Sequence, residues 1–367
     1  MERKVVELRE ICEAGSSNIA QKDIKHLSGQ YPIYGASGLI KHMDFYSQDK
    51  PYIAIVKDGA GVGRAMLLPA YSSVIGTMQY ILPNNNVDIN YLYHVIANLN
   101  LKKYKTGATI PHIYFKNYKA EKIVLPEMKE QKYVANILDK VNEIINLHKE
   151  QLDKLDLIVK SRFVEMFGDP IQNPFGWKLK PFLESGNCKN GMNFSADESG
   201  VKLQYLGVGD FKNLTKIEDV KKLGQVSLNK KPGEEYILKD GDIVFVRSNG
   251  NKALVGRCLA VYPNDIPTTY SGFCIRYRKT DESIDVQYLL QVLKTDSMRS
   301  MMAGRGANIQ NLNQQILAQL QIPVPPINYQ KEFATFTHQV DKLKLEVKRA
   351  LQKTDILYKA LIQQYFN

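Results

Sequence analysis

The sequence EQKYVANILDKVNEIINLHKEQLDKLDLIVKSRFVEMF, residues 130–167, contains neither glycine nor proline. Its apolar residues recur at alternating steps of four and three, which is the pattern of a coiled-coil seam. Charged and polar residues fill the other positions, as they do on solvated helix faces. The stretch therefore predicts one helix of 38 residues, about 55 Å long at about 1.5 Å per residue. The expected seam consists of Val134, Leu138, Val141, Ile145, Leu152, Leu155 and Val159.

His148 interrupts this seam between Ile145 and Leu152. A polar residue at a single seam position commonly fixes the register of paired helices, and we favour that interpretation. A metal ligand or a pH-sensitive switch is the alternative.

The helix lies in a segment that the chain repeats at an offset of 199 residues. Residues 107–168 align with residues 306–367 without a gap, with 15 identities over 62 positions. GATI aligns with GANI, and IVLPEMKEQK aligns with IPVPPINYQK. Because neither helix can bury its seam alone, we expect the two to pack against each other, antiparallel and with pseudo-twofold symmetry. The second seam is expected at Phe336, Val340, Leu343, Val347, Ala350, Leu357 and Leu361, with a break at Thr354.

The segments before the two helices resemble each other more loosely. YIAIVKDG, from Tyr52, aligns with DIVFVRSNG, from Asp242, and INYLYHVI, from Ile89, aligns with VQYLLQVL, from Val286. The β-rich runs PYIAIV, RAMLLP and MQYILP in the first copy, and DIVFVR, RCLAVYP and GFCIRYR in the second, are separated by Gly, Asn and Pro, which is typical of strands and turns. Each segment is expected to form a globular domain with a curved antiparallel sheet and a helix.

The predicted fold class is therefore α+β (mixed α/β), with two globular domains joined by two long antiparallel coiled-coil helices. The expected boundaries are 1–121 for the first globular domain and 122–168 for the first helical segment, then 169–320 and 321–367 for the second copies.

Composition narrows the class of partner. There are 49 Lys and Arg residues against 38 Asp and Glu, which gives a net charge of +11 and favours an anionic partner, nucleic acid first. No run approaches the roughly 20 apolar residues of a membrane span, and the charged N-terminus does not resemble a secretory signal. Four separated cysteines without a CxxC pair predict free thiols, no metal site and a cytoplasmic location.

Two stretches imitate enzyme motifs. GAGVG, residues 59–63, resembles a nucleotide-binding glycine loop, but RAMLLP follows it as a strand where that motif requires a helix. NPF, residues 173–175, resembles part of an amino-methyltransferase loop, but no cofactor-binding βαβ unit precedes it, so GDPIQNPFGW is expected to be a turn-rich linker. We therefore expect no catalytic centre and no cofactor.

Basic and polar side chains cluster instead at the predicted turns, at equivalent places in the two copies. Arg, Lys and Asn side chains pair with base edges in the major groove, and Lys and Arg also hold phosphates. A solvated surface charge is the alternative for any single residue, and Arg278 and Arg299 lie nearby. The candidate DNA-binding residues are Lys57, Asp58, Arg64, Lys102, Lys103, Lys105, Thr109, His112, Arg247, Ser248, Asn249, Lys252, Arg257, Arg276, Arg305 and Asn308.

With these features in place, the whole chain resembles the specificity subunit of type I restriction–modification enzymes. The resemblance is carried by YPIYGASG, TGATIPHI, GRGANIQN, the IVLPEMKEQ and IPVPPINYQ stretches, FGDPIQNPFGW and the two heptad helices. This chain departs from the family pattern at two places: it has LPEMKEQ where the family tends to have PPLxEQ, and NYQ where the family has EQ. At a helix start, the loss of Glu weakens a favourable interaction with the helix dipole.

The resemblance implies two target-recognition domains, each reading half of a bipartite site in double-stranded DNA, and no catalysis by this chain. It implies two methyltransferase subunits as partners, which carry S-adenosylmethionine, and indirect contact with motor–nuclease subunits, which use ATP and magnesium. Helices of about 55 Å would separate the half-site centres by about 40–55 Å, or about 12–16 base pairs. Alternatives are a specificity subunit of a related type II (IIB/IIG-like) system, a catalytic DNA methyltransferase, and a methyltransferase-associated scaffold that never touches DNA.

Overall fold

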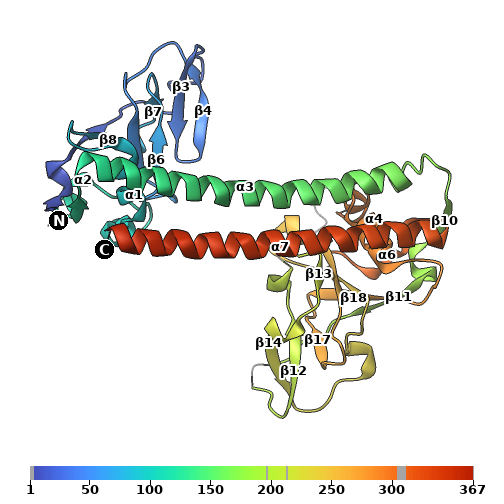
Figure 1. Cartoon of the computed structure of the whole chain (residues 1–367). Coiled ribbons are helices and arrows are strands. Elements are labelled where there is room, and N and C mark those ends of the chain that lie inside the picture. The colour runs from blue at the N-terminus through green and yellow to red at the C-terminus, as the bar shows by residue number, and fades with distance from the viewer. Residues whose placement is uncertain (1–3, 196, 212–213, 304–310, 367) are drawn as a thin grey trace. The chain divides into compact units, whose positions relative to one another are not determined.

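The computed structural model describes residues 4–195, 197–211, 214–303 and 311–366. The chain divides into two compact units: unit 1 is Met1–Gln151 with Val347–Asn367, and unit 2 is Leu152–Glu346. The two forty-residue helices α3 (Met128–Phe167) and α7 (Ile327–Phe366) stand out in Figure 1. The division between the units falls within both helices, so each unit consists of one globular part and a segment of each helix.

The globular part of unit 1 is built on an antiparallel four-stranded sheet of order β2-β8-β5-β6. Helix α1 packs against β5 and β6, β1 pairs with β9, and the sheet of order β4-β3-β7 lies on the side away from α3 (Figure 1). The elements are β1 (Lys4–Glu7), β2 (Cys12–Ser16), β3 (Tyr31–Gly35), β4 (Gly38–Met43), β5 (Tyr52–Val56), β6 (Ala65–Leu68), β7 (Ser73–Val74), β8 (Met78–Pro83), α1 (Ile89–Asn98), α2 (Phe115–Tyr118) and β9 (Lys122–Leu125).

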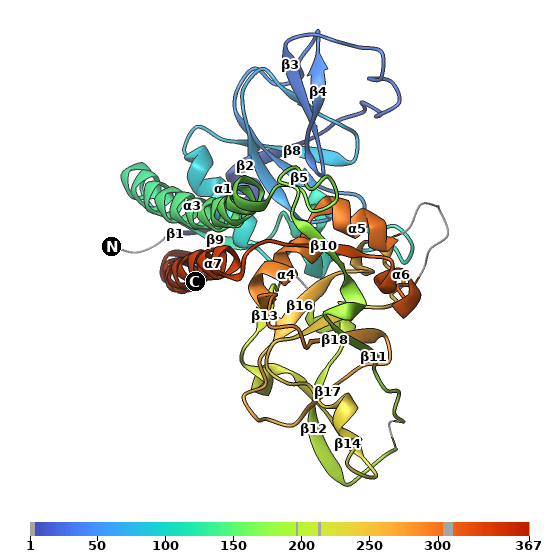
Figure 2. The same ribbon diagram turned by 90° about the vertical axis from the view of Figure 1, so that its right-hand side faces the viewer.

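Unit 2 repeats this plan with a five-stranded sheet of order β11-β18-β15-β16-β13 and a pair of β10 with β19. The sheet of order β14-β12-β17 lies on the side away from α7 (Figures 1 and 2). The elements are β10 (Lys178–Pro181), β11 (Gly186–Asn190), β12 (Val201–Leu206), β13 (Lys216–Ile217), β14 (Gly224–Leu228), β15 (Asp242–Val246), β16 (Cys258–Val261), β17 (Thr268–Tyr270), β18 (Cys274–Lys279), α4 (Val286–Lys294), α5 (Asp296–Ala303), α6 (Gln314–Ala318) and β19 (Gln321–Val324).

The predicted mixed α/β architecture is confirmed, and all six predicted strands form. The antiparallel sheet expected in each copy is present as β2-β8-β5-β6 and as β11-β18-β15-β16. Three parallel pairs were not anticipated: β3 with β7, β12 with β17 and β13 with β16. Each of these pairs joins segments far apart in the sequence, where no hairpin turn announces the pairing.

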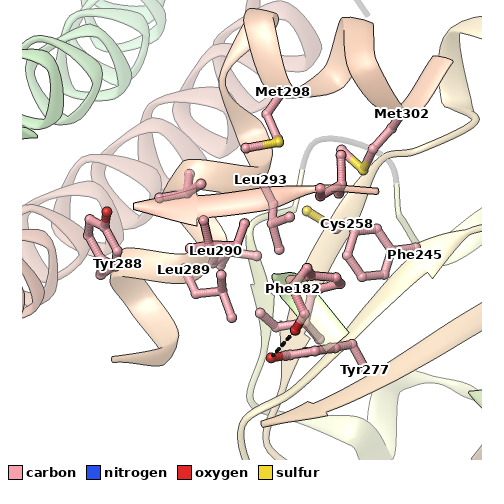
Figure 3. Close-up of a cluster of buried hydrophobic side chains, with 14 of the residues drawn as sticks. Phe182, Phe245, Cys258, Tyr277, Tyr288, Leu289, Leu290, Leu293, Met298 and Met302 are labelled. Carbon is pink, nitrogen blue, oxygen red and sulfur yellow. Dashed lines mark hydrogen bonds between the residues drawn. The ribbon is translucent and has the colours of Figure 1, made fainter. Parts of the chain in front are cut away.

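The core of unit 2 gathers aromatic side chains from the sheet and from both long helices. The rings of Phe182 and Tyr277 stack with centroids 4.1 Å apart, and Figure 3 shows the Tyr277 hydroxyl directed at the Phe182 carbonyl. Phe163 of α3 meets Phe333 of α7 edge to face, with centroids 5.5 Å apart. These side chains fix the two helix segments to the globular part.

Within unit 2 the two helix segments run antiparallel. Lys344 Nζ lies 2.5 Å from Asp156 Oδ1, Arg162 Nη2 lies 3.1 Å from Glu332 Oε1, and Phe167 packs against Tyr329. Residue numbers therefore rise along α3 where they fall along α7. In unit 1, Val134, Ala135 and Leu138 of α3 belong to a core against which Leu361, Ile362 and Tyr365 of α7 pack.

The predicted seam of α3 is buried or partly buried at every position. The predicted seam of α7 is wrong at Leu343 and Leu357, which are 55% and 50% exposed. Lys344 and Leu351 turn inward instead. His148 is partly buried and its Nδ1 lies 3.2 Å from Gln151 Oε1 of its own helix. Its register-setting role remains a prediction.

A buried glutamine near the start of each long helix ties that helix to its globular part. Gln131 Nε2 donates to the carbonyls of Asn86 and Pro126, and its Oε1 accepts from the Asp88 amide at 2.8 Å. Gln330 makes the same three bonds in unit 2, to Ser283, Pro325 and Asp285. Asp88 and Asp285 also cap α1 and α4 through their side chains. The repeat thus preserves one hydrogen-bonded junction in both units.

Replacing Gln131 or Gln330 by Leu is expected to destabilise the corresponding unit by about 3 kcal/mol, because each change removes three hydrogen bonds made by a buried side chain. Calorimetric unfolding measures the effect. Gln151→Leu, at an exposed position of α3, is the control and should change stability little. Equal melting temperatures for Gln131→Leu and Gln151→Leu would contradict the structural role of the junction.

Candidate nucleic-acid interface

The candidate interface of unit 1 is a corner where three backbone segments meet at the end of β5. The amides of Lys57 and Asp58 both donate to the Thr77 carbonyl, at 3.0 and 3.2 Å, and the Ile113 amide donates to the Lys57 carbonyl at 2.9 Å. Residues 106–112 form a tight loop, closed by two hydrogen bonds between the backbones of Thr106 and His112. The corner therefore brings the turn after β5 and the TGATIPH loop together.

Unit 2 builds the same corner at the end of β15. The amides of Arg247 and Ser248 both donate to the Phe273 carbonyl, at 2.8 and 3.3 Å, and the Leu312 amide donates to the Arg247 carbonyl at 2.8 Å. Ser248 also forms an isolated β-bridge with Asn311. Lys57 and Arg247 thus occupy equivalent places in one backbone arrangement that carries different side chains.

The side chains at the corner of unit 1 form a chain of contacts. Lys57 Nζ lies 3.0 Å from Asp58 Oδ2, and Asp58 Oδ1 lies 2.6 Å from His112 Nδ1. Hydrogen bonds from His112 and Lys57 hold the pKa of Asp58 below its ordinary value, against the opposing effect of burial. Thr109 is exposed in the loop formed by residues 106–112. The structure therefore brings Lys57, Asp58 and His112 together as candidate contacts.

The basic residues around this corner differ in their freedom to contact a ligand. Arg64 is exposed immediately before β6, and its carbonyl accepts a hydrogen bond from the Val56 amide at the end of β5. Lys102 and Lys105 are exposed in the segment before the TGATIPH loop. Lys103 is paired with Glu121 and lies over the Tyr104 ring, so its ammonium is already engaged.

In unit 2, Arg247 Nη1 donates to the Gly272 carbonyl at 3.2 Å, which leaves most of the five guanidinium donors for other acceptors. Asn249 accepts from the Asn251 amide and orders the turn that leads to the exposed Lys252. Ser248 is partly buried beside Arg247.

The candidates Arg257 and Arg276 and the neighbouring Arg278 have other side-chain surroundings, although the Arg257 carbonyl accepts from the Val246 amide at the end of β15. Arg276 is only 3% exposed and donates to Asn187 Oδ1 at 3.0 Å. Arg278 is paired through two nitrogens with the buried Asp242, at 2.8 and 2.7 Å. Arg257 lines a cavity beside α3 and α7. Arg305 and Asn308 lie outside the described residues.

Sequence reasoning missed Thr77 and Phe273, whose carbonyls hold the two corners. Phe273 is 59% exposed next to Arg247, which makes its ring available for apolar contact with a ligand. An aromatic residue near the start of the predicted strand GFCIRYR was the available signal. The two junction glutamines were visible only as identities within the repeat.

The predictions for the GAGVG and GDPIQNPFGW motifs are met by the structure. GAGVG forms the turn between β5 and β6, with Gly59 and Gly63 at φ +92° and +85°, which is a strand–turn–strand connection as expected. GDPIQNPFGW is a tight turn in which Asn173 exchanges hydrogen bonds with the backbone of Trp177. The four cysteines are free. Among the described residues, no helix is long and apolar enough to span a bilayer, and no cluster of three or more metal-ligating His, Cys, Asp or Glu side chains occurs.

The fold and the paired corners define a duplicated protein: two α/β modules of one plan, each presenting its own polar side chains from the same backbone frame. Comparison with known proteins identifies the family. The model of the type I restriction modification DNA specificity domain matches residues 2–157 and again residues 176–354. The chain therefore belongs to the family of type I restriction–modification DNA specificity proteins and contains two copies of its domain.

Curated relatives agree with this assignment. The chain is 26% identical over 321 residues to the type I restriction enzyme MjaVIII specificity subunit of Methanocaldococcus jannaschii, an alignment that covers 81% of this chain and 73% of the relative. It is 23% identical over 367 residues to the StySPI specificity subunit of Salmonella potsdam, which covers 91% and 77%.

Solved structures share the fold. The S subunit of a type I restriction–modification system from M. genitalium superimposes with a TM-score of 0.62 at 14% identity, over 100% of this chain and 96% of that one. A chain from a study of complex assembly and conformational transition in the type I system gives a TM-score of 0.57 at 15% identity, over 99% and 97%.

Proposed function

We propose that this chain is the DNA specificity subunit of a type I restriction–modification system and that each unit reads one half of a bipartite target. The globular parts, residues 1–121 and 169–320, act as target-recognition domains. The helical segments, 122–168 and 321–367, act as spacers. On this proposal Lys57, Asp58 and His112 contact one half-site, and Arg247, Ser248 and Asn249 contact the other.

One observation carries this proposal above the others. Five positions of the corner after β5 have equivalents in the corner after β15, and their backbones make the same contacts. The side chains differ, since Arg247 and Ser248 stand where unit 1 has Lys57 and Asp58. A conserved frame with exchanged side chains suits two modules that read different sequences, since base edges are distinguished by the donors and acceptors presented to them.

Methylome sequencing tests the function directly. A host that expresses this chain with its methyltransferase partner should acquire methylation at one bipartite sequence, and omission of this chain should abolish it. The runner-up is a specificity subunit of a related type II (IIB/IIG-like) system. The two systems differ in the genes that they need for cleavage, so identifying those genes separates them. A methylation pattern that persists without this chain would overturn the proposal.

We infer that the two helices form an antiparallel coiled coil with pseudo-twofold symmetry, which sets the spacing between the half-sites. Support comes from the antiparallel pairing within unit 2 and from the common core that α3 and α7 share in unit 1. The repeat offset of 199 residues exchanges α3 with α7. In this role the chain contributes recognition, and its partners contribute catalysis.

The repeat offset of 199 residues also relates exposed aliphatic residues on α3 to exposed aliphatic residues on α7. Unit 1 exposes Ile144, Ile356 and Leu357, at 43, 68 and 50%. Their repeat equivalents in unit 2 are Leu343, Leu157 and Ile158, exposed at 55, 61 and 47%. We call these six residues the exposed aliphatic set. Large apolar side chains held in water at matching positions suit two identical partners, and we propose methyltransferase subunits as those partners.

Ile158→Glu and Leu357→Glu test this docking role. Each single change should remove one of two methyltransferase subunits from the complex, and the double change should remove both, because a carboxylate resists transfer into an apolar interface. Mass photometry of the assembled complex gives the stoichiometry. Asn136→Glu, at an exposed position of α3 outside the set, serves as the control. Full stoichiometry in the double variant would show that the partners dock elsewhere.

A further inference from the structure

Unit 2 contains a cavity of about 350 Å³ between its globular part and the adjoining segments of α3 and α7. Strand β16, helix α4 and the start of α5 contribute its globular wall. Two carboxylates, Asp156 and Asp341, line it together with five cationic side chains. The cationic residues are Lys160, Arg257, Lys294, Arg299 and Lys344.

The two carboxylates are already balanced by lysines. Asp156 is paired with Lys344 at 2.5 Å, and Asp341 is paired at 3.1 Å with Lys216, which does not line the cavity. The lining therefore keeps an excess of positive charge. An anion would complement it, since Lys and Arg are the side chains that bind phosphate groups most strongly.

Lys294 is central to this excess. It is the last residue of α4 and is partly buried, next to Leu290 and Leu293, which are 4% and 0% exposed. Within the described part of the chain its ammonium makes no hydrogen bond or ion pair, and burial lowers its pKa. The charges of Asp156 and Asp341 favour the ammonium, but the effect of burial outweighs them, so a charged Lys294 opposes folding.

Unit 1 provides an internal comparison. The repeat offset of 197 residues places Ala97 where unit 2 has Lys294, and the offset of 199 places Ile145 and Asn142 where unit 2 has Lys344 and Asp341. Tyr93 and Tyr358, the equivalents of Leu290 and Val159, pack against the core of unit 1. Unit 1 keeps Asp355 and Lys359 as the equivalents of Asp156 and Lys160 but has neutral residues in place of Lys294, Lys344 and Asp341. These three charges are therefore specific to unit 2.

We propose that the cavity of unit 2 binds a small organic phosphate. The phosphate group lies against Lys294, with Lys160 and Arg299 nearby, and the apolar part of the ligand lies along Val159 and Leu214, which also line the cavity. A cavity of about 350 Å³ falls within the range of about 300–1,000 Å³ found for small-molecule sites. Because the lining residues come from α3, α7 and the globular part, the bound ligand would stabilise unit 2.

Isothermal titration of the full chain with adenosine monophosphate and with inorganic pyrophosphate tests this site. Adenosine monophosphate should bind in a one-to-one ratio, and more tightly than pyrophosphate, because only the nucleotide uses the apolar wall. Lys294→Met should weaken nucleotide binding at least tenfold. The same variant should melt at an unchanged or higher temperature without ligand, because it removes a buried charge, and this readout excludes misfolding as the cause.

Lys342→Met and Lys359→Met are the matched controls. Lys342 is exposed on α7 outside the cavity lining, and Lys359 is the exposed repeat equivalent of Lys160 in unit 1. Both variants should bind adenosine monophosphate as the unmodified chain does. The absence of binding, equal affinity for pyrophosphate, or equal weakening by Lys294→Met and either control would each overturn the assignment.

Discussion

Deletion of residues 146–152 together with residues 345–351 is expected to give a protein that directs methylation to a new target. The two segments are repeat equivalents, one in α3 and one in α7, so the deletion removes one heptad from each helix and keeps the buried faces aligned. Seven residues shorten a helix by about 10.5 Å, which corresponds to about three base pairs at about 3.4 Å each. Both half-sites should persist, with a gap shorter by about that amount.

Methylome sequencing of a host carrying the doubly deleted chain measures this result. Deletion of residues 146–152 alone is the control: it places α3 out of register with α7 and should abolish specific methylation without creating a new target. A target with the original gap in the double deletion would refute the spacing role of the helices. It would leave half-site reading intact, since that depends on the globular parts.

The helices also show how far sequence analysis reaches. The predicted seam residues of α3 are all buried or partly buried, because the seam positions of this helix are apolar apart from His148. The seam of α7 was assigned from apolar residues alone, and this selected Leu343 and Leu357, which belong to the exposed aliphatic set. The repeat register would have placed Lys344 inward as the equivalent of Ile145. Its aliphatic stem packs in the seam while its ammonium reaches Asp156.

The sequence predicted only part of the candidate interface. The alignment of YIAIVKDG with DIVFVRSNG correctly placed Lys57 and Arg247 at equivalent strand ends. It could not reveal that Arg276 and Arg278 are occupied by Asn187 and Asp242, because those partners lie 89 and 36 residues away in the sequence. Long-range pairing decides which basic residues remain available, and local patterns carry no record of it.

Arg247→Met is expected to relax recognition at one half-site only. The Arg247 backbone is fixed by its bonds to Phe273 and Leu312. Among the described residues its guanidinium makes one hydrogen bond, to the Gly272 carbonyl, so the remaining donors can reach a base edge. A bidentate arginine contact contributes about 1–3 kcal/mol of discrimination, or about 5- to 150-fold between bases. Methylome sequencing should show one degenerate position in one half of the target.

Lys57→Met is the matched variant in unit 1, because Lys57 holds the equivalent position after β5. It should relax the other half-site and leave the one read by unit 2 unchanged. Binding measured across salt concentrations separates base reading from phosphate contact: loss of a phosphate contact weakens every sequence alike and reduces the salt slope by about one. Uniform weakening with Arg247→Met would therefore assign this residue to the DNA backbone and move sequence recognition to the neighbouring Ser248 and Asn249.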